Sequence, residues 1–247
     1  MSFKEKVIYQ IYPKSFLDTN QDGVGDLPGI EKKLPYLKRL GVDMVWLSPI
    51  YPSPQNDNGY DVADYTAINP MFGTMDDFES LMATAKDNGI EIMLDMVFNH
   101  VSIEHEWFQK ALAGDQKYQD YFILRDKPTD WVSKFGGNAW APFGDTGKYY
   151  LHLYDVTQAD LNWRNPEVRE ELFEVLRFWM DKGIKGFRFD VINVIGKDEV
   201  LIDCPENDGK PAYTDRPIAH EFIRMMNQAT YGEDTEIVTV GEMSFTT

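Results

Sequence analysis

The sequence predicts an α/β fold in which parallel strands alternate with helices. One observation is that five short segments are almost continuously apolar, as in strands covered on both faces of a parallel sheet. Another is that amphipathic, helix-length segments lie between them, which indicates βαβ units. The predicted strands are residues 6–12, 43–49, 90–98, 184–191 and 236–242.

The predicted helices have recognisable ends. The first stops at Gly41, the second follows the capping residue Thr74 and stops at Gly89, and the third has Pro166 in its first turn. These signals support four helices between the strands, over residues 26–41, 75–89, 165–183 and 217–231.

Five strands are too few for a closed barrel, which needs eight, whereas an open sheet would leave unpaired edges. We therefore predict a TIM (β/α)8 barrel of which about the first five βα units are present. We expect the chain to be the N-terminal part of a longer protein, and to fold poorly and show no activity by itself.

Residues 100–163 interrupt the alternation of strands and helices. They are rich in aromatic residues, glycine and aspartate, have no helix-length apolar period, and are too many for a structureless loop. We predict a small subdomain inserted after the third strand. The predicted domains are residues 1–99 (first part of the barrel), 100–164 (inserted subdomain) and 165–247 (continuation of the barrel).

Composition and charge exclude several classes of protein. The 247 residues are 43% hydrophobic, which permits a substantial core and argues against disorder. The net charge of −17 argues against binding nucleic acid or an anionic membrane. The single Cys204 excludes a disulfide scaffold. Because no apolar signal core or membrane span is recognisable, we expect a cytoplasmic protein.

Arg188 and Asp190 lie two residues apart on the fourth predicted strand, so their side chains point to the same side. Active sites of barrels lie at the carboxyl ends of the strands. We expect Arg188 to depress the pKa of Asp190 and keep it ionised, as a carboxylate nucleophile requires. A buried structural salt bridge is the alternative.

Glu242 ends the next strand, within reach of Asp190. Two carboxyl groups about 5–5.5 Å apart define a retaining glycosidase, in which one attacks the sugar and the other protonates the leaving oxygen. To act as an acid near neutral pH, Glu242 needs a pKa raised by burial and by neighbouring carboxylates. The alternative is a surface glutamate on a loop.

Polar residues also follow the second and third strands. The segment 95–100 places His100 at the same rim, although a single histidine is more often structural. Asp57 and Tyr60 suit a sugar, whose ring packs on the tyrosine while the carboxylate accepts hydroxyl hydrogen bonds; a polar β-turn is the alternative.

Residues 18–26 carry oxygen-bearing side chains at alternate positions, like the first half of an EF-hand loop. Position twelve would be Gly29 instead of glutamate, and a strand precedes the loop, so we expect a structural Ca²⁺ or Mg²⁺ site of another kind. An Asx-rich turn without an ion is the alternative. The expected ligands are Asp18, Asn20, Asp22, the Val24 carbonyl and Asp26.

Together these segments resemble the α-amylase family of glycoside hydrolases (family 13). Residues 95–100, 158–162, 186–193 and 241–242 match its segments in order. The resemblance implies that Asp190 is the nucleophile, Glu242 the general acid/base, and Arg188 and His100 sugar contacts. The family's fourth segment, a His-Asp pair after a later strand, has no counterpart in this sequence.

Within the family, residues 7–16 and the metal loop resemble the oligo-1,6-glucosidase group. That resemblance implies a closed pocket in which Asp57 and Tyr60 hold the terminal glucose, with Phe135 lining it. Val191 resembles members that cut linkages other than α-1,4. The segments 131–137, 154–163 and 240–247 most resemble phospho-α,α-trehalases.

The resemblance therefore implies hydrolysis of trehalose 6-phosphate to glucose and glucose 6-phosphate by the complete enzyme. Lys134 and Lys148 are candidates for the phosphate contact, although each is more simply a solvated surface lysine. The alternatives are an oligo-1,6-glucosidase, a glucosyl-transferring isomerase and a non-catalytic transporter partner subunit. We expect a monomer with a small sugar substrate, no organic cofactor, and no nucleic-acid or membrane partner.

Overall fold

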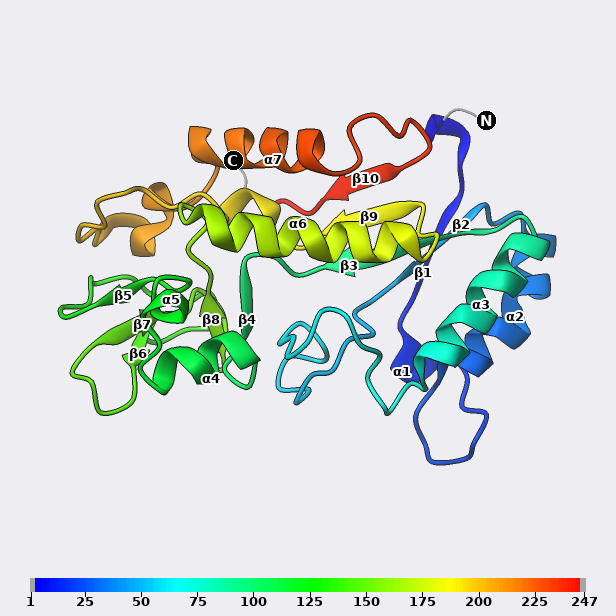
Figure 1. The fold of residues 1–247 in the computed structure, drawn as a ribbon, viewed down its shortest axis with the longest axis horizontal. Helices are drawn as coiled ribbons and strands as arrows, with labels where there is room; N and C mark the ends of the chain where they lie inside the picture. Colours follow the sequence, from blue (N-terminus) through cyan, green and yellow to red (C-terminus); the bar gives the residue numbers. More distant parts are fainter. Residues whose placement is uncertain (1–2, 245–247) are drawn as a thin grey trace.

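The computed structural model describes residues 3–244, which form a parallel sheet, four long helices and a cluster of smaller elements inserted after the third strand of the sheet (Figure 1). Residues 245–247, the end of the segment 240–247 on which part of the resemblance rests, lie outside the described residues.

The sheet has five parallel strands in chain order. A sheet whose order never reverses has barrel connectivity, whereas a doubly wound sheet switches direction. All five predicted strands are present, each somewhat shorter than predicted. They are β1 (Ile8–Ile11), β2 (Met44–Leu47), β3 (Glu91–Met96), β9 (Gly186–Phe189) and β10 (Val238–Gly241).

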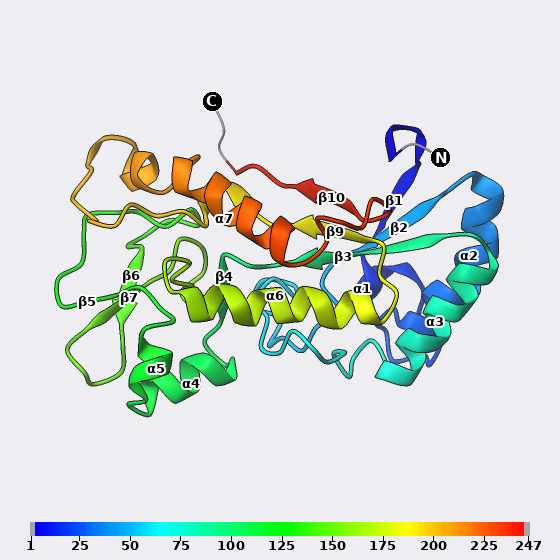
Figure 2. The same cartoon turned by 45° about the horizontal axis from the view of Figure 1, so that its top comes forward.

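All four predicted long helices are also present, and polar side chains cap three of them. Asp26 accepts a hydrogen bond from Gly29 N–H, Thr74 forms a capping box with Asp77, and Asn165 caps the third helix. In Figure 2 the first two lie side by side at one end of the sheet, and the other two run beside β9 and β10. They are α2 (Leu27–Leu40), α3 (Met75–Asp87), α6 (Pro166–Asp181) and α7 (Pro217–Ala229).

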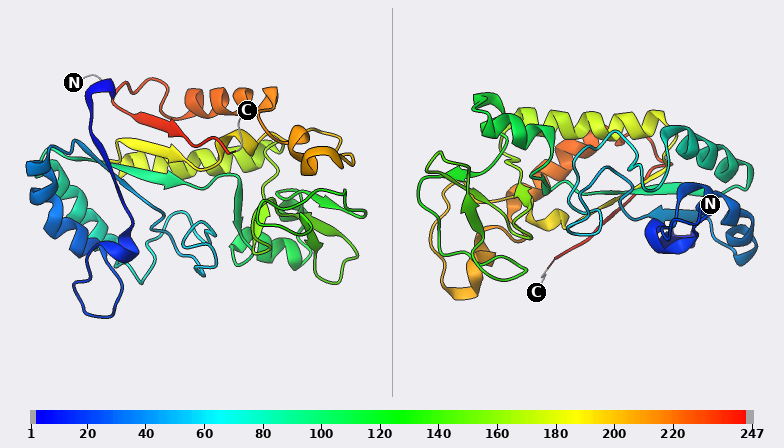
Figure 3. Two further views of the ribbon diagram at one scale, coloured as in Figure 1. Left: turned by 180° about the vertical axis from the view of Figure 1, so that it is seen from behind. Right: turned by 90° about the horizontal axis from the view of Figure 1, so that it is seen from below.

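The inserted elements lie at the end of the molecule toward which β3 and β9 point (Figures 1 and 3). Two antiparallel sheets, of order β4-β8 and β5-β7-β6, are joined by two short helices. The helix α4 was not expected, because its seven residues are too few to show a clear period. The elements are β4 (His100–Ser102), α4 (Glu106–Leu112), α5 (Gln116–Gln119), β5 (Leu124–Arg125), β6 (Trp140–Pro142), β7 (Tyr149–Leu151) and β8 (Gln158–Asp160).

Short helical turns occupy several connections, and buried tryptophans fix the layers against one another. The indole N–H of Trp179 on α6 donates to the Tyr65 carbonyl at 2.8 Å, and that of Trp163 donates to the Phe98 carbonyl at 2.7 Å. The second bond anchors the chain just beyond β3, where the candidate site begins. The short turns are η1 (Phe3–Glu5), α1 (Pro13–Phe16), η2 (Ile192–Val194) and η3 (Glu206–Ala212).

Candidate active site

One arginine holds three carboxylates where β3, β9 and β10 end. Arg188 pairs in register with Asp95 across β3 and β9, and its Nη1 donates to the carboxylates of Asp95 at 2.8 Å and of Asp190 at 2.7 Å. Its Nη2 lies 2.8 Å from Glu242 Oε2. The structure therefore brings the three predicted residues Arg188, Asp190 and Glu242 together and adds Asp95, for which the sequence analysis gave no role.

Burial controls the ionisation of this cluster. Asp95 is 1% exposed and Asp190 is 7% exposed. Burial raises the pKa of Asp95 to about 6, although Arg188 lowers it. Burial, and then the charges of Asp95 and Glu242, raise the pKa of Asp190 well above its ordinary value against the pull of Arg188. The expectation of a depressed pKa for Asp190 was wrong, because burial and the neighbouring carboxylates outweigh the single guanidinium of Arg188.

Glu242 is joined to β9 through its backbone and its carboxylate. Its N–H donates to the Phe189 carbonyl at 2.9 Å, and its Oε2 accepts from the N–H of Val191 at 3.2 Å. Val191 has φ 40° and ψ 40°, the left-handed conformation that β-branched residues rarely adopt. The side chain of Glu242 is 45% exposed, so the burial that was expected for this residue is not found in the described structure.

The predicted sugar contacts that follow β2 and β3 also meet near this cluster. The hydroxyl of Tyr60 donates to Asp95 at 3.1 Å, and its carbonyl oxygen lies 3.1 Å from His100 Nε2. Gln158 on β8 donates through its amide to Asp57 at 2.9 Å and to the Tyr60 carbonyl at 3.1 Å. Gln158, which the sequence analysis assigned no role, therefore ties the inserted elements to the Asp57 loop.

A second carboxylate, that of Asp61, fixes the loop that carries Asp57. Asp61 is fully buried, and it accepts hydrogen bonds from the Ser53 hydroxyl at 2.8 Å and from the N–H groups of Asn56 at 2.9 Å and Asp57 at 3.2 Å. Burial raises the pKa of Asp57, although its hydrogen bond with Gln158 lowers it. Asp61 thus positions Asp57 without being a member of the charged cluster.

His100 is a neutral residue near pH 7. Burial lowers its pKa to about 4. The Asn99 amide nitrogen lies 3.1 Å from Nδ1, and the Tyr60 carbonyl lies 3.1 Å from Nε2. A proton on Nε2 satisfies both contacts, because Nε2 then donates and Nδ1 accepts. Phe135 is 59% exposed and reaches this group through Tyr154, whose ring lies 5.7 Å from Phe135 and 5.2 Å from His100.

A second buried ion pair lies beside His100. Lys197 Nζ lies 2.7 Å from Asp160 Oδ1 and donates to the Asn99 side-chain oxygen at 2.6 Å. Asp160 also accepts from the Asn99 amide at 3.0 Å and from the N–H of Leu153 at 2.8 Å. Burial lowers the pKa of Lys197. Asp160 and Asn99 belong to segments named for the family resemblance, but no local pattern marks Lys197.

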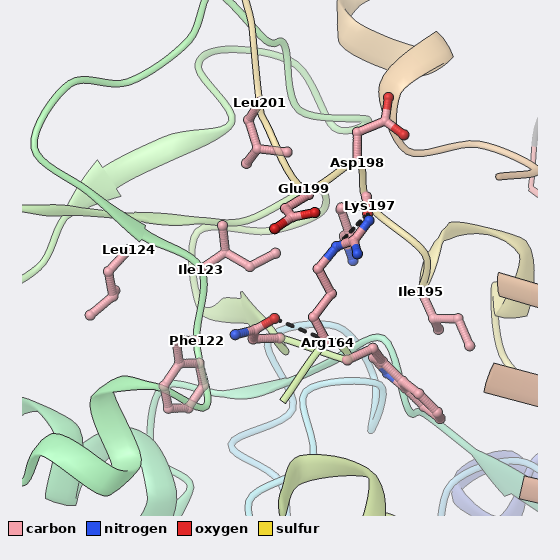
Figure 4. Close-up of a pocket in the computed structure, with 11 residues that line it drawn as sticks. Phe122, Ile123, Leu124, Arg164, Ile195, Lys197, Asp198, Glu199 and Leu201 are labelled. Atoms are coloured by element: carbon pink, nitrogen blue, oxygen red, sulfur yellow. Dashed lines mark hydrogen bonds between the residues drawn. The ribbon is translucent and has the colours of Figure 1, made fainter. Parts of the chain in front are cut away.

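A separate cavity of about 250 Å³ lies next to the Lys197 segment (Figure 4). Arg164 crosses it, and its Nε and Nη2 donate to the Lys197 carbonyl at 3.2 and 3.0 Å. None of the predicted sugar contacts lines this cavity. Arg164 therefore holds the backbone of Lys197 in place, and the cavity is distinct from the carboxylate cluster.

The predicted metal loop is held by its own hydrogen bonds. Asp18 accepts from the N–H groups of Gln21 at 2.7 Å and Gly23 at 2.9 Å, and the bond from Gly23 lowers its pKa. Asp26 is the N-cap of α2, with Oδ1 bonded to Gly29 and Oδ2 to Thr19, so both of its carboxylate oxygens already accept hydrogen bonds within the protein. Within residues 3–244 no group of three or more His, Cys, Asp or Glu side chains is arranged to hold a metal ion.

The remaining predicted ligands of this loop have suitable chemistry for a hard cation. Asp18, Asn20 and Asp22 carry side-chain oxygens on one turn, where Asp22 accepts from Val24 N–H at 2.8 Å. Oxygen donors of this kind suit Ca²⁺. Elsewhere, no described helix combines the length and the apolar character needed to cross a membrane.

The sequence of this chain matches a known protein family and several known proteins. Residues 10–247 match the family described as alpha amylase, catalytic domain. The trehalose-6-phosphate hydrolase of Bacillus subtilis (strain 168) is 52% identical over 252 residues, covering 99% of this chain and 45% of that protein. The oligo-1,6-glucosidase of Parageobacillus thermoglucosidasius is 48% identical, covering 97% of this chain and 45% of that protein.

A solved structure gives the same result. The crystal structure of Bacillus licheniformis trehalose-6-phosphate hydrolase superposes with a TM-score of 0.96 at 53% identity, covering 99% of this chain and 45% of that chain. This chain thus spans somewhat less than half the length of the relatives that it matches.

Proposed function

Because this chain belongs to the alpha-amylase catalytic-domain family, whose fold is a TIM barrel, we propose that it carries the catalytic pair of a retaining α-glucoside hydrolase. One observation carries the proposal: separate nitrogens of Arg188 bind Asp190 and Glu242. That arrangement keeps two carboxyl groups side by side, as the retaining reaction requires.

In the proposed reaction, Asp190 attacks the anomeric carbon while the glycosidic bond breaks. Glu242 donates its proton to the departing oxygen, and a covalent glucosyl-enzyme remains. Glu242 then takes a proton from water, whose oxygen attacks the anomeric carbon and releases Asp190. The excess negative charge around Arg188 favours the positively charged, oxocarbenium-like transition state.

We propose that the glucose attacked is a terminal one. The contacts of Tyr60 with Asp95, and of Gln158 with Asp57, support a pocket that ends beside the carboxylates. Asp57 and the neutral His100 supply an acceptor and a ring for the sugar, and the exposed ring of Phe135 supplies an apolar edge. Asp95 acts through Arg188 as a positioning residue.

For the substrate we propose trehalose 6-phosphate, which the complete protein would cleave to glucose and glucose 6-phosphate. The identity of 52% to a trehalose-6-phosphate hydrolase supports this choice. The second candidate is an α-1,6-linked glucose oligosaccharide, supported by the 48% identity to an oligo-1,6-glucosidase. We further propose that the protein is cytoplasmic and monomeric, and that its chemistry needs no organic cofactor.

The test is a substrate comparison on the protein expressed from its complete reading frame. Trehalose 6-phosphate, trehalose, isomaltose and sucrose are offered separately, and the release of glucose, glucose 6-phosphate and isomerised sucrose is followed. We expect glucose 6-phosphate from the first substrate and little product from the others. A preference for isomaltose would replace the proposed substrate by the second candidate, and isomerisation of sucrose without net hydrolysis would point to a transferase.

We also propose that Asp18, Asn20, Asp22, Asp26 and the Val24 carbonyl bind a structural Ca²⁺, with Mg²⁺ as the alternative. The oxygen chemistry of the loop supports this, and the ion would take no part in the reaction. An ion bound only by the folded protein stabilises it by RT ln(1 + c/Kd), where c is the ion concentration, so the melting temperature rises with the logarithm of the ion concentration above Kd. A calcium titration that leaves the melting temperature unchanged in wild type and in Asp22→Ala would exclude the site.

A further inference from the structure

A cationic side chain from the inserted elements lies beside the segment that follows Glu242. Lys134 Nζ donates to the Ser244 hydroxyl at 2.8 Å, two residues beyond Glu242. Ser244 in turn donates its N–H to Asn193 at 2.8 Å and accepts from the Asn193 amide at 2.9 Å. The ammonium group is therefore next to a backbone segment that is itself fixed to β9.

Lys134 is presented by a rigid turn. Its N–H donates to the Leu153 carbonyl at 2.7 Å, and the neighbouring Ser133 hydroxyl donates to the Tyr154 carbonyl at 2.6 Å. The ammonium lies 5.4 Å from the ring centre of Tyr154 and 5.5 Å from that of Tyr213. The turn and the two rings therefore restrict the positions that the ammonium group can occupy.

The surroundings of Lys134 suit an anionic group. The side chain is half-buried, and burial lowers its pKa to about 8. Burial thus disfavours the charged ammonium group. A neighbouring dianion would offset this effect, because an opposite charge favours the ionised form. The chain as a whole has a net charge of −17, so a phosphorylated substrate requires a local cation.

We propose that Lys134 binds the phosphate monoester of the leaving sugar and so determines specificity for a phosphorylated substrate. This inference rests on the proposed function, because the leaving group lies on the side of the residue that protonates it, Glu242. The proposal also distinguishes between Lys134 and Lys148, the two candidates for the phosphate contact that the sequence analysis named. Lys148 lines a shallow surface hollow with Gln116 and Glu167, away from the carboxylate cluster.

The test compares two substrates in the protein from the complete reading frame. Trehalose 6-phosphate has a phosphorylated leaving group, and p-nitrophenyl α-glucoside has an uncharged one. We expect Lys134→Met to lower the ratio of the two kcat/KM values by about 10- to 100-fold, as loss of a charge-assisted hydrogen bond would. Lys134→Arg should restore most of the ratio, and Lys148→Met should leave it unchanged.

Inhibition by products gives a second measurement. Glucose 6-phosphate should inhibit wild type more strongly than glucose does, and Lys134→Met should remove the difference. An equal fall of activity on both substrates would assign Lys134 a structural role and overturn the proposal, as would an unchanged ratio. If the wild-type protein does not cleave trehalose 6-phosphate at all, the proposed function fails, and this result is distinct from the outcomes for Lys134.

Discussion

Two buried charged networks lie near each other at the carboxyl ends of the strands, and they differ in their balance of charge. In one, Lys197 meets Asp160 one to one, with Asn99 bonded to both. In the other, the single guanidinium of Arg188 contacts three carboxylates. The first network has matched charges, and the second has an excess of negative charge.

The difference teaches which buried charges serve the fold and which serve chemistry. A matched pair whose oxygens are all bonded within the protein holds its segments together and has little left to offer a ligand. In the unmatched cluster burial raises the pKa values of Asp95 and Asp190, and the excess negative charge favours any partner that develops positive charge. Burial alone does not distinguish the two networks, because Asp160 and Asp95 are both almost fully buried.

The largest expected effect is on catalysis in the unmatched cluster. Asp190→Asn keeps the size of the side chain but removes the nucleophile, so we expect kcat to fall by about three orders of magnitude or more. The melting temperature should stay the same or rise, because the substitution removes one negative charge from a site where negative charge is in excess. Steady-state kinetics and thermal unfolding measure both, with the exposed Asp145→Asn as control. Retained activity would contradict the assignment of Asp190.

The matched pair should respond in the opposite way. Asp160→Asn leaves Lys197 buried without its counter-charge, so we expect the free energy of unfolding to fall by about 3–5 kcal/mol. Urea denaturation of the two single variants measures the contrast directly. If Asp160→Asn were as stable as wild type while Asp190→Asn unfolded, the distinction between matched and unmatched networks would be wrong.

The smallest expected effect sharpens the description of the unmatched cluster. The Tyr60 hydroxyl bond favours the ionised form of Asp95, whose pKa is about 6. Activity that needs ionised Asp95 should fall as the pH drops through about 6. In Tyr60→Phe that acidic limb should move to higher pH, with a loss of about 3- to 10-fold in kcat/KM at pH 6.5. The exposed Tyr36→Phe is the control, and an unmoved limb would show that Asp95 does not control the profile.

Much of the architecture could be predicted because its signals are local. The strands are short apolar runs, of which β2, β3 and β9 are buried and the edge strands β1 and β10 are largely exposed. Asp26, Thr74 and Asn165 mark the beginnings of three helices. The alternation of side chains along a strand also explains why Arg188 and Asp190, two residues apart, could be placed together from spacing alone. Each of these signals lies within a few residues of the feature that it predicts.

Other features depend on pairings between distant segments and left no local signal. The role of Gln158 follows from the antiparallel pairing of β4 and β8, which sets a residue of the insertion beside Asp57. The partner of Lys197, Asp160, is 37 residues earlier in the chain at the end of the insertion, with α6 and β9 between them. The pKa of Asp190 was mispredicted because it depends first on burial and then on the charges of Asp95 and Glu242, none of which a two-residue motif shows.

The bonds that assemble this site join residues very far apart in the chain, and that has a consequence for how the molecule folds. Gln158 and Asp57 are 101 residues apart, and Lys134 and Ser244 are 110 residues apart. Contacts of such long sequence separation carry a large loop-closure entropy and slow the folding rate. In a refolding experiment, helical circular dichroism should therefore recover before the burial of Asp57 and Lys134, so that these contacts report the last step of folding.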